Sequence, residues 1–215
     1  MARGGGAIEV LEVETFGREE LLDALRATRL RGFGGARVYA EASLELVESD
    51  PAELAPAQRY VLREGVEKIL ALRAALLGRG IDVFALEGGL WVRTADSPGE
   101  RIPVIPPIVE ESREPDGRTV WIVNDGIHRV FAARSLGLPI NTVRVAGVPP
   151  EHPYYALALP NGWTEVTELD ALPDGFQKKA YRQPDNYKAL FREFNDVFPG
   201  VQKERKKSNP ESLRA

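Results

Sequence analysis

The sequence predicts a fold of the α+β class. Residues 120–123 are four consecutive large apolar residues, the pattern of a short strand covered on both faces. They lead directly into residues 127–136, where apolar side chains recur at helical spacing, and Gly137 is expected to end that helix. A further strand pattern follows at 141–145, so that strand, helix and strand form one α/β unit.

The first 41 residues predict a strand and a helix that extend this core at its N-terminal side. Residues 8–13 alternate apolar and acidic side chains, which favours an edge strand with one wet face. Residues 18–30 carry leucines at helical spacing, and the glycine-rich stretch 31–35 ends that helix. We assign residues 1–41 to an N-terminal strand–helix extension.

The core itself is expected to span residues 42–149. Its longest helix is predicted at residues 60–77, which have a broad apolar face and are followed by Gly78-Arg79-Gly80. The remaining strands are predicted at residues 42–47, 81–86, 90–93, 105–109, 119–123 and 141–145. The pair at 81–86 and 90–93 is interpreted as a hairpin around Glu87-Gly88-Gly89.

Residues 150–215 form an aromatic and basic C-terminal extension. Tyrosines are scattered there among turn sequences, and residues 186–197 predict one amphipathic helix with Tyr187, Phe191 and Phe194 on one side. Residues 202–215 are interpreted as a basic tail. Residues 176–215 include ten basic and five acidic side chains, whereas the whole chain has a net charge of −4. A polyanion such as DNA would therefore meet this end of the chain.

Composition excludes several kinds of site. The chain has no cysteine and two histidines, so disulfides, thiolate metal sites and cysteine nucleophiles are ruled out, and a multi-histidine zinc site is disfavoured. No apolar run approaches the roughly 20 residues that a membrane span needs. The first six residues also lack the apolar segment of a secretory signal. We expect a cytoplasmic protein without a membrane partner.

The junction of strand and helix at residues 124–129 carries the candidate site. Asp125 is the expected N-cap of the helix, and Gly126, Ile127, His128 and Arg129 follow it. The first turn of a helix has unpaired N–H groups and a partial positive charge, so that amides, imidazole and guanidinium would converge on one anion. The alternative is purely structural: a cap, a hydrogen-bonding histidine and a solvated arginine.

These residues resemble the core of the ParB/sulfiredoxin superfamily. The resemblance is carried by Asp125-Gly126-Ile127-His128-Arg129, Ala132-Ala133-Arg134 and Leu136-Gly137, with weaker matches at Leu44–Val47, Leu54, Pro56, Gln58, Tyr60, 106–109 and 139–145. It covers roughly residues 43–146 and implies a mixed sheet with flanking helices. Sulfiredoxin has a cysteine where this chain has Ile127, so sulfinate repair by that route is excluded.

Within the superfamily, the motif is most similar to that of the free-serine kinases. Their Asp-Gly-His-His-Arg is matched at four of five positions, with Ile127 in place of the first histidine. This resemblance implies phosphoryl transfer from ATP or ADP to a small hydroxylated molecule. Gly126, Ile127, His128 and Arg129 would hold the phosphates, Asp125 would bind Mg²⁺, and His128 would assist catalysis.

The resemblance to the free-serine kinases also implies roles for residues outside the motif. The acid that accepts the proton in the kinases is placed here at Glu64, nearer the helix start than Glu67. Lys178, Lys179 and Arg182 would fold over the nucleotide and contact an anionic substrate. Two alternatives stay open: a ParB-like DNA-binding or nuclease protein that uses the basic tail, with Arg205-Lys206-Lys207, and a non-catalytic nucleotide-sensing module.

Overall fold

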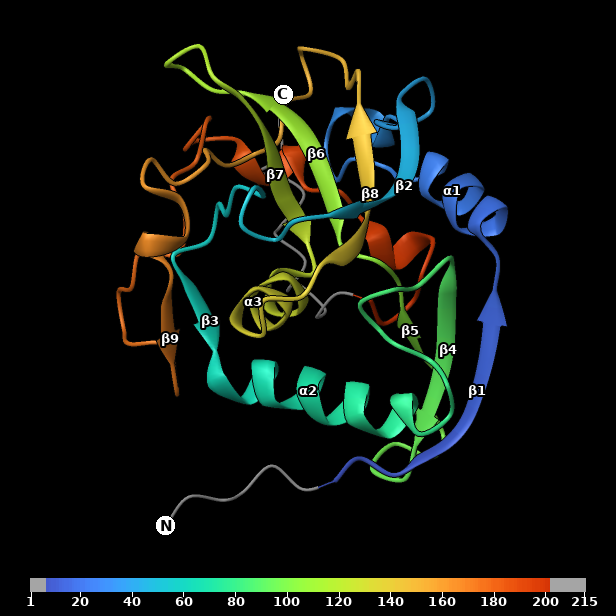
Figure 1. Cartoon of the computed structure of the whole chain (residues 1–215). Coiled ribbons are helices and arrows are strands. Elements are labelled where there is room, and N and C mark those ends of the chain that lie inside the picture. Colours follow the sequence, from blue (N-terminus) through green and yellow to red (C-terminus); the bar gives the residue numbers. More distant parts are fainter. Residues whose placement is uncertain (1–6, 202–215) are drawn as a thin grey trace.

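A four-stranded mixed sheet lies at the centre of the computed structural model, which describes residues 7–201 (Figure 1). In spatial order its strands are β2 (Ser43–Ser49), β8 (Ile140–Ala146), β6 (Ile108–Arg113) and β7 (Thr119–Asp125). β8 and β6 are parallel, and the two outer pairs are antiparallel. The predicted α+β class and mixed sheet are confirmed. The basic tail lies outside the described residues.

Two helices lie below this sheet, with α3 (Ile127–Ser135) between the sheet and α2 (Arg63–Leu77) in Figure 1. Val130 of α3 packs against Val109 and Val123 of the sheet. Ala132 and Ala133 of α3 belong to a second cluster, which includes residues of α2. The strand–helix–strand unit predicted from residues 120–145 is therefore present, and α3 is held between two apolar layers.

The long helix begins three residues later than the predicted residue 60. Tyr60–Leu62 form the short strand β3, which pairs in parallel with β9 (Thr167–Leu169). β9 lies more than a hundred residues further along the chain, so this pairing leaves no local signal in the sequence. The periodicity of residues 63–77 was sufficient to locate the helix but not its start.

A second, three-stranded sheet consists of β4 (Gly89–Thr94) between β1 (Val10–Phe16) and β5 (Ile102–Val104). β1 is an edge strand, as predicted, and α1 (Arg18–Arg26) follows it. The predicted hairpin of 81–86 with 90–93 is wrong, because residues 81–86 form turns instead of a strand. There Asp82 accepts the backbone N–H of Phe84, and its own carbonyl accepts that of Ala85.

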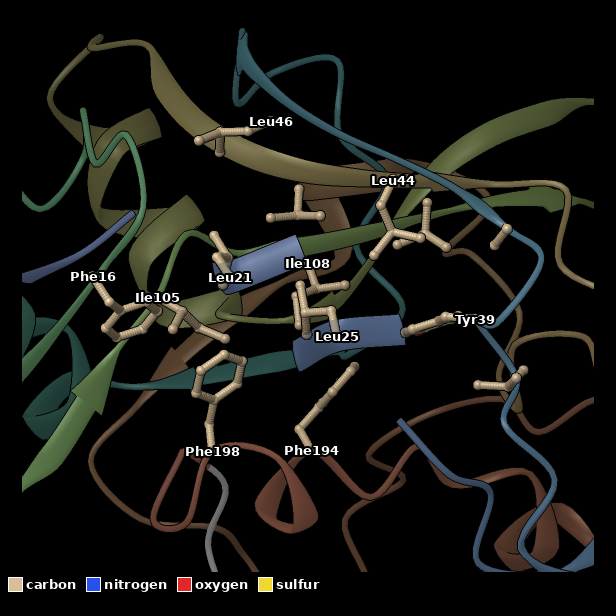
Figure 2. Close-up of a cluster of buried hydrophobic side chains, with 14 of the residues drawn as sticks. Phe16, Leu21, Leu25, Tyr39, Leu44, Leu46, Ile105, Ile108, Phe194 and Phe198 are labelled. Atoms are coloured by element: carbon tan, nitrogen blue, oxygen red, sulfur yellow. The ribbon is translucent and has the colours of Figure 1, made fainter. Parts of the chain in front are cut away.

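One hydrophobic cluster draws on all three predicted segments of the chain (Figure 2). Leu21 and Leu25 come from α1, Leu44 and Ile108 from the central sheet, and Phe194 from the C-terminal extension, and each is less than a tenth exposed. Together these apolar side chains form a core that neither extension nor sheet would build alone.

The helix predicted at 186–197 is replaced by two short 3-10 helices, Tyr187–Leu190 and Phe194–Asp196. The backbone between them bonds elsewhere: Arg31 N–H donates to the Phe191 carbonyl, and Glu193 N–H donates to that of Arg29. A continuous α-helix would need those groups for its own ladder. Phe194 is nevertheless fully buried, as its predicted core role requires.

Candidate anion-binding site

The turn between β7 and α3 is made by Gly126, which adopts the left-handed conformation with φ of +85° and is the N-cap of the helix. The prediction that Asp125 caps α3 is wrong. Asp125 is the last residue of β7, and its carboxylate accepts a hydrogen bond from Arg129 Nη2 at 3.3 Å. The left-handed turn at Gly126, followed by the first turn of α3, brings these two side chains together.

Gly126 also lies in tight contact with the segment before β6. A Cβ atom at this position would lie 2.9 Å from Cβ of Pro107 and 3.0 Å from Nη2 of Arg129. Glycine is required here both by the backbone conformation and by the space. The next residue, Ile127, is half-buried and packs in two of the apolar clusters, so its contribution to an anion site would come from its backbone.

The Arg129 side chain is buried, with 9% of its surface exposed, and it forms an ion pair with Asp125. Within residues 7–201, its Nη1 is buried and makes no hydrogen bond. Burial lowers the pKa of Arg129, and the neighbouring Asp125 carboxylate opposes that shift. A buried donor without an acceptor costs about 1–3 kcal/mol, more for a charged group, so an anion beside Nη1 would be strongly favoured.

His128 connects the starts of two helices. Its Nε2 accepts the backbone N–H of Leu62, the N-cap residue of α2, at 3.0 Å. Acceptance requires Nε2 without a proton, which leaves a neutral ring with its proton on Nδ1. The hydrogen-bonding role considered for His128 from the sequence is thus present in this bond to Leu62.

Gly65 permits this close approach of α2 to the imidazole. A Cβ atom on Gly65 would lie 2.6 Å from His128 Cδ2 and 2.8 Å from Nε2. Sequence reasoning missed Gly65, although a glycine within a helical pattern is a signal of close approach by another group. Leu62 and Pro107 were also missed, because they contribute through backbone and proximity and carry no chemical signature.

Glu64 lies in the first turn of α2, next to Gly65 in sequence. Its side chain is 72% exposed and forms an ion pair with Lys68 at 2.6 Å. It lines a cavity of about 820 Å³, whose described lining includes no residue of 124–129. The structure thus brings the start of α2 beside His128, while the Glu64 carboxylate faces solvent.

The three cations of the C-terminal extension have other contacts. Lys179 Nζ donates to the hydroxyls of Tyr154 and Tyr155 at 2.9 and 2.6 Å. Arg182 pairs with the buried Glu114 at 2.5 Å. Lys178 is exposed, and its carbonyl accepts the N–H of Arg59. Among the described residues, the contacts of Arg182 and Lys178 join the extension to the core, those of Lys179 lie within the extension, and none involves the α3 motif.

Asn124 joins the motif to a buried polar cluster that the sequence did not predict. Its Nδ2 donates to the Tyr39 hydroxyl at 2.8 Å and to Glu110 at 3.2 Å. Glu110 in turn pairs with Arg192. Burial, followed by the nearby Glu110 charge, raises the pKa of Tyr39, so this phenol stays protonated and donates to Glu110.

Within residues 7–201, no helix is long and apolar enough to cross a membrane. The same range contains no group of three or more histidine, aspartate or glutamate side chains placed to hold a metal ion.

A comparison with known protein families gives a match that covers most of the chain. The family model described as ParB CE domain matches residues 20–167, which extends beyond the resembling segment 43–146 at both ends. Comparisons with curated proteins and with solved structures found no match.

Proposed function

This chain belongs to the ParB CE domain family, and on that premise we propose that it is a nucleotide-dependent phosphotransferase acting on a small hydroxylated metabolite. The observation that carries the proposal is the buried guanidinium of Arg129 at the start of α3, whose Nη1 has no hydrogen-bond partner among the described residues. A phosphate oxygen is the partner that best matches a guanidinium in charge and geometry.

In this proposal the nucleotide's phosphates lie at the N-terminus of α3. The helix dipole and the amides of Gly126, Ile127 and His128 favour negative charge there, and Arg129 adds a full positive charge. His128 lies in the same first turn, and the bond from the Leu62 N–H to its Nε2 fixes the position of the ring beside the proposed phosphate site.

Asp125 would hold Mg²⁺. Magnesium in nucleotide sites is bound by one or two carboxylates together with substrate phosphates, and one carboxylate at the end of β7 fits that donor set. When bound, the ion neutralises charge on the phosphates. Asp125 would then exchange its contact with Arg129 for the metal, which frees the guanidinium for the nucleotide.

Transfer would use Glu64 as the proton acceptor. The acceptor's hydroxyl oxygen attacks the terminal phosphorus, the bond from phosphorus to the bridging oxygen breaks, and the proton passes to the Glu64 carboxylate. The contact of Gly65 with His128 supports this role, because it sets the first turn of α2 beside the proposed phosphate site. The four-of-five match to the free-serine kinase motif makes L-serine the first acceptor to test.

Nucleotide binding is tested by thermal denaturation of the full chain with ATP, ADP and CTP, with and without Mg²⁺. We expect at least one nucleotide to raise the melting temperature of the wild type, since a ligand of the folded state stabilises it. Arg129→Ala should abolish that rise. Arg134→Ala, at the other end of α3, should retain it. A nucleotide effect that survives Arg129→Ala would refute the site.

Turnover separates the kinase from the two alternatives. Consumption of ATP or ADP with serine or a related hydroxy compound and Mg²⁺, lost in Glu64→Gln while nucleotide binding persists, supports the phosphotransferase. Tight, salt-sensitive binding of duplex DNA without turnover would replace it by the DNA-binding function. Nucleotide stabilisation with neither activity would leave a sensing module.

A further inference from the structure

A cavity of about 820 Å³ opens between one flank of α2 and the strands β4 and β5. Sites for small molecules typically have volumes of about 300–1,000 Å³ and a mostly apolar lining with a few polar groups. The proposed phosphate site does not use this cavity, except that Glu64 stands at its margin.

The floor of the cavity is aliphatic. Ile69 and Leu72 project from α2, and Val92 and Val104 come from β4 and β5. Both valines are less than a tenth exposed, so they belong to the folded core and form a fixed surface. An apolar body of a ligand would be removed from water against these four side chains.

The margin of the cavity is acidic. Three carboxylates line it, those of Glu64, Glu67 and Asp96, against one cation, Lys68. Lys68 is already paired with Glu64 at 2.6 Å. Among residues 7–201, neither Glu67 nor Asp96 has an ion-pair partner, and Glu67 has only the longer-range attraction of Arg63.

Neighbouring arginines do not neutralise this margin, because they have other carboxylates. Arg93 pairs with Glu12, and Arg101 pairs with Glu14, both across the three-stranded sheet. The margin therefore has two negative charges that no described cation balances, above an apolar floor.

We infer that this cavity binds a small amphipathic cation, a molecule with an apolar body and an amino or ammonium group. The aliphatic floor receives the body, and Glu67 and Asp96 receive the cation. This binding goes beyond the proposed function and does not require phosphoryl transfer.

The test compares three probes of equal chain length, n-hexylamine, n-hexanol and n-hexanoate, by calorimetric titration of the full chain. We expect hexylamine to bind most tightly and hexanoate least. In the double variant Glu67→Gln/Asp96→Asn, hexylamine binding should weaken about tenfold, the effect of losing two partly exposed ion pairs. Hexanol binding should not change.

A matched control removes the same number of charges elsewhere. Glu41→Gln/Glu111→Gln takes two exposed carboxylates from the central part of the chain, and it should leave hexylamine affinity within about twofold of the wild type. Equal affinity for hexylamine and hexanol, or an equal loss in both double variants, would overturn the inference. Because Glu67 and Asp96 are outside the proposed phosphate site, nucleotide stabilisation should persist in Glu67→Gln/Asp96→Asn, and the two proposals fail separately.

Discussion

His128 Nε2 accepts the backbone N–H of Leu62 at 3.0 Å, and this bond joins the first turn of α3 to the start of α2. The two helix starts carry the phosphate-binding group of the proposed transfer reaction, on α3, and its proposed base, on α2. The geometry of the site therefore depends on a contact between a side chain and a backbone group, which fixes the ring and the helix at once.

Gly65→Ala tests that contact. The added methyl group would lie 2.6 Å from His128 Cδ2, so either the imidazole or α2 must move. We expect a loss of about 1–3 kcal/mol in the free energy of unfolding, typical of overpacking, although alanine is intrinsically the better helix former. Urea denaturation measures the loss, and the nucleotide-induced rise in melting temperature should fall with it.

Gly78→Ala is the control on the same helix. Its Cβ would meet only the Ala75 carbonyl oxygen at 3.6 Å, an ordinary contact, and its φ of −62° suits alanine. This variant should be neutral or stabilised by up to about 1 kcal/mol. If the two variants behaved alike, the proximity of Gly65 to His128 would not limit the packing of α2.

The pair of Glu110 and Arg192 anchors the C-terminal extension. Both side chains are 1% exposed or less, Arg192 Nη2 lies 2.5 Å from Glu110 Oε1, and Arg192 also donates to the carbonyls of His152, Pro153 and Leu190. Removing one partner leaves an uncompensated buried charge. We expect Arg192→Met to cost about 3–5 kcal/mol in the free energy of unfolding, measured by urea denaturation.

The double variant Glu110→Leu/Arg192→Met distinguishes a lost charge from a lost packing contact. Because it removes both charges, it should recover a large part of the stability lost in Arg192→Met. A double variant as unstable as the single one would mean that the carbonyl contacts of Arg192 within the extension, and not its pairing with Glu110, account for the lost stability.

Local pattern was enough to predict the elements around the candidate site. Three predicted elements are present: the apolar run at 120–123 is β7, the helical spacing after Gly126 is α3, and the strand at 141–145 is β8. Each of them buries the apolar face that its sequence pattern predicted. The motif residues were named from the same stretch. Their contacts were not predictable. The N-cap of α3 is Gly126 and not Asp125, and His128 accepts a hydrogen bond from Leu62, which lies 66 residues away in the sequence.

Elements whose partners are distant in sequence were predicted least well. Tyr60–Leu62 form a strand because they pair with β9. Residues 186–197 do not form the predicted helix, because their backbone bonds to residues 29–32 and Arg192 pairs with a buried carboxylate. Apolar spacing alone does not encode these competing partners. The buried, unpartnered Nη1 of Arg129 is also visible only once the fold surrounds it.

For the ion pair of Arg129 and Asp125, we expect one double variant to abolish nucleotide binding while it leaves the stability of the protein almost unchanged. The pair is buried, and Nη1 has no partner among the described residues, so the guanidinium is incompletely compensated in the free protein. Replacing both charges in Asp125→Asn/Arg129→Met should leave the free energy of unfolding within about 1 kcal/mol of the wild type. The same variant should show no stabilisation by nucleotide, measured in parallel by thermal denaturation. A loss of several kcal/mol would instead assign the pair a structural role.

Asp82, which lies outside the candidate site, is expected to make the stability of the protein depend on pH. Arg73 donates to both of its carboxylate oxygens, at 2.8 and 2.7 Å, and this hydrogen bonding lowers the pKa of Asp82 below its ordinary value of 3.8. A carboxyl group whose pKa is depressed in the folded state adds stability above the unfolded value, and loses it as the pH falls through the folded value. Asp82→Asn keeps the acceptor for the Phe84 N–H and removes the charge.

We therefore expect Asp82→Asn to lower the free energy of unfolding by about 1 kcal/mol near pH 7. Urea denaturation across the acid range should show the gap between wild type and variant beginning to close below about pH 4, where the unfolded carboxyl takes up its proton, and closing fully only below the depressed pKa of the folded state. Arg73→Met should give a similar gap with the same acid dependence, since it removes the other half of the pair. A gap that stayed constant down to about pH 2 would show that the variant acts through packing at the turn after α2 and not through the charge of Asp82.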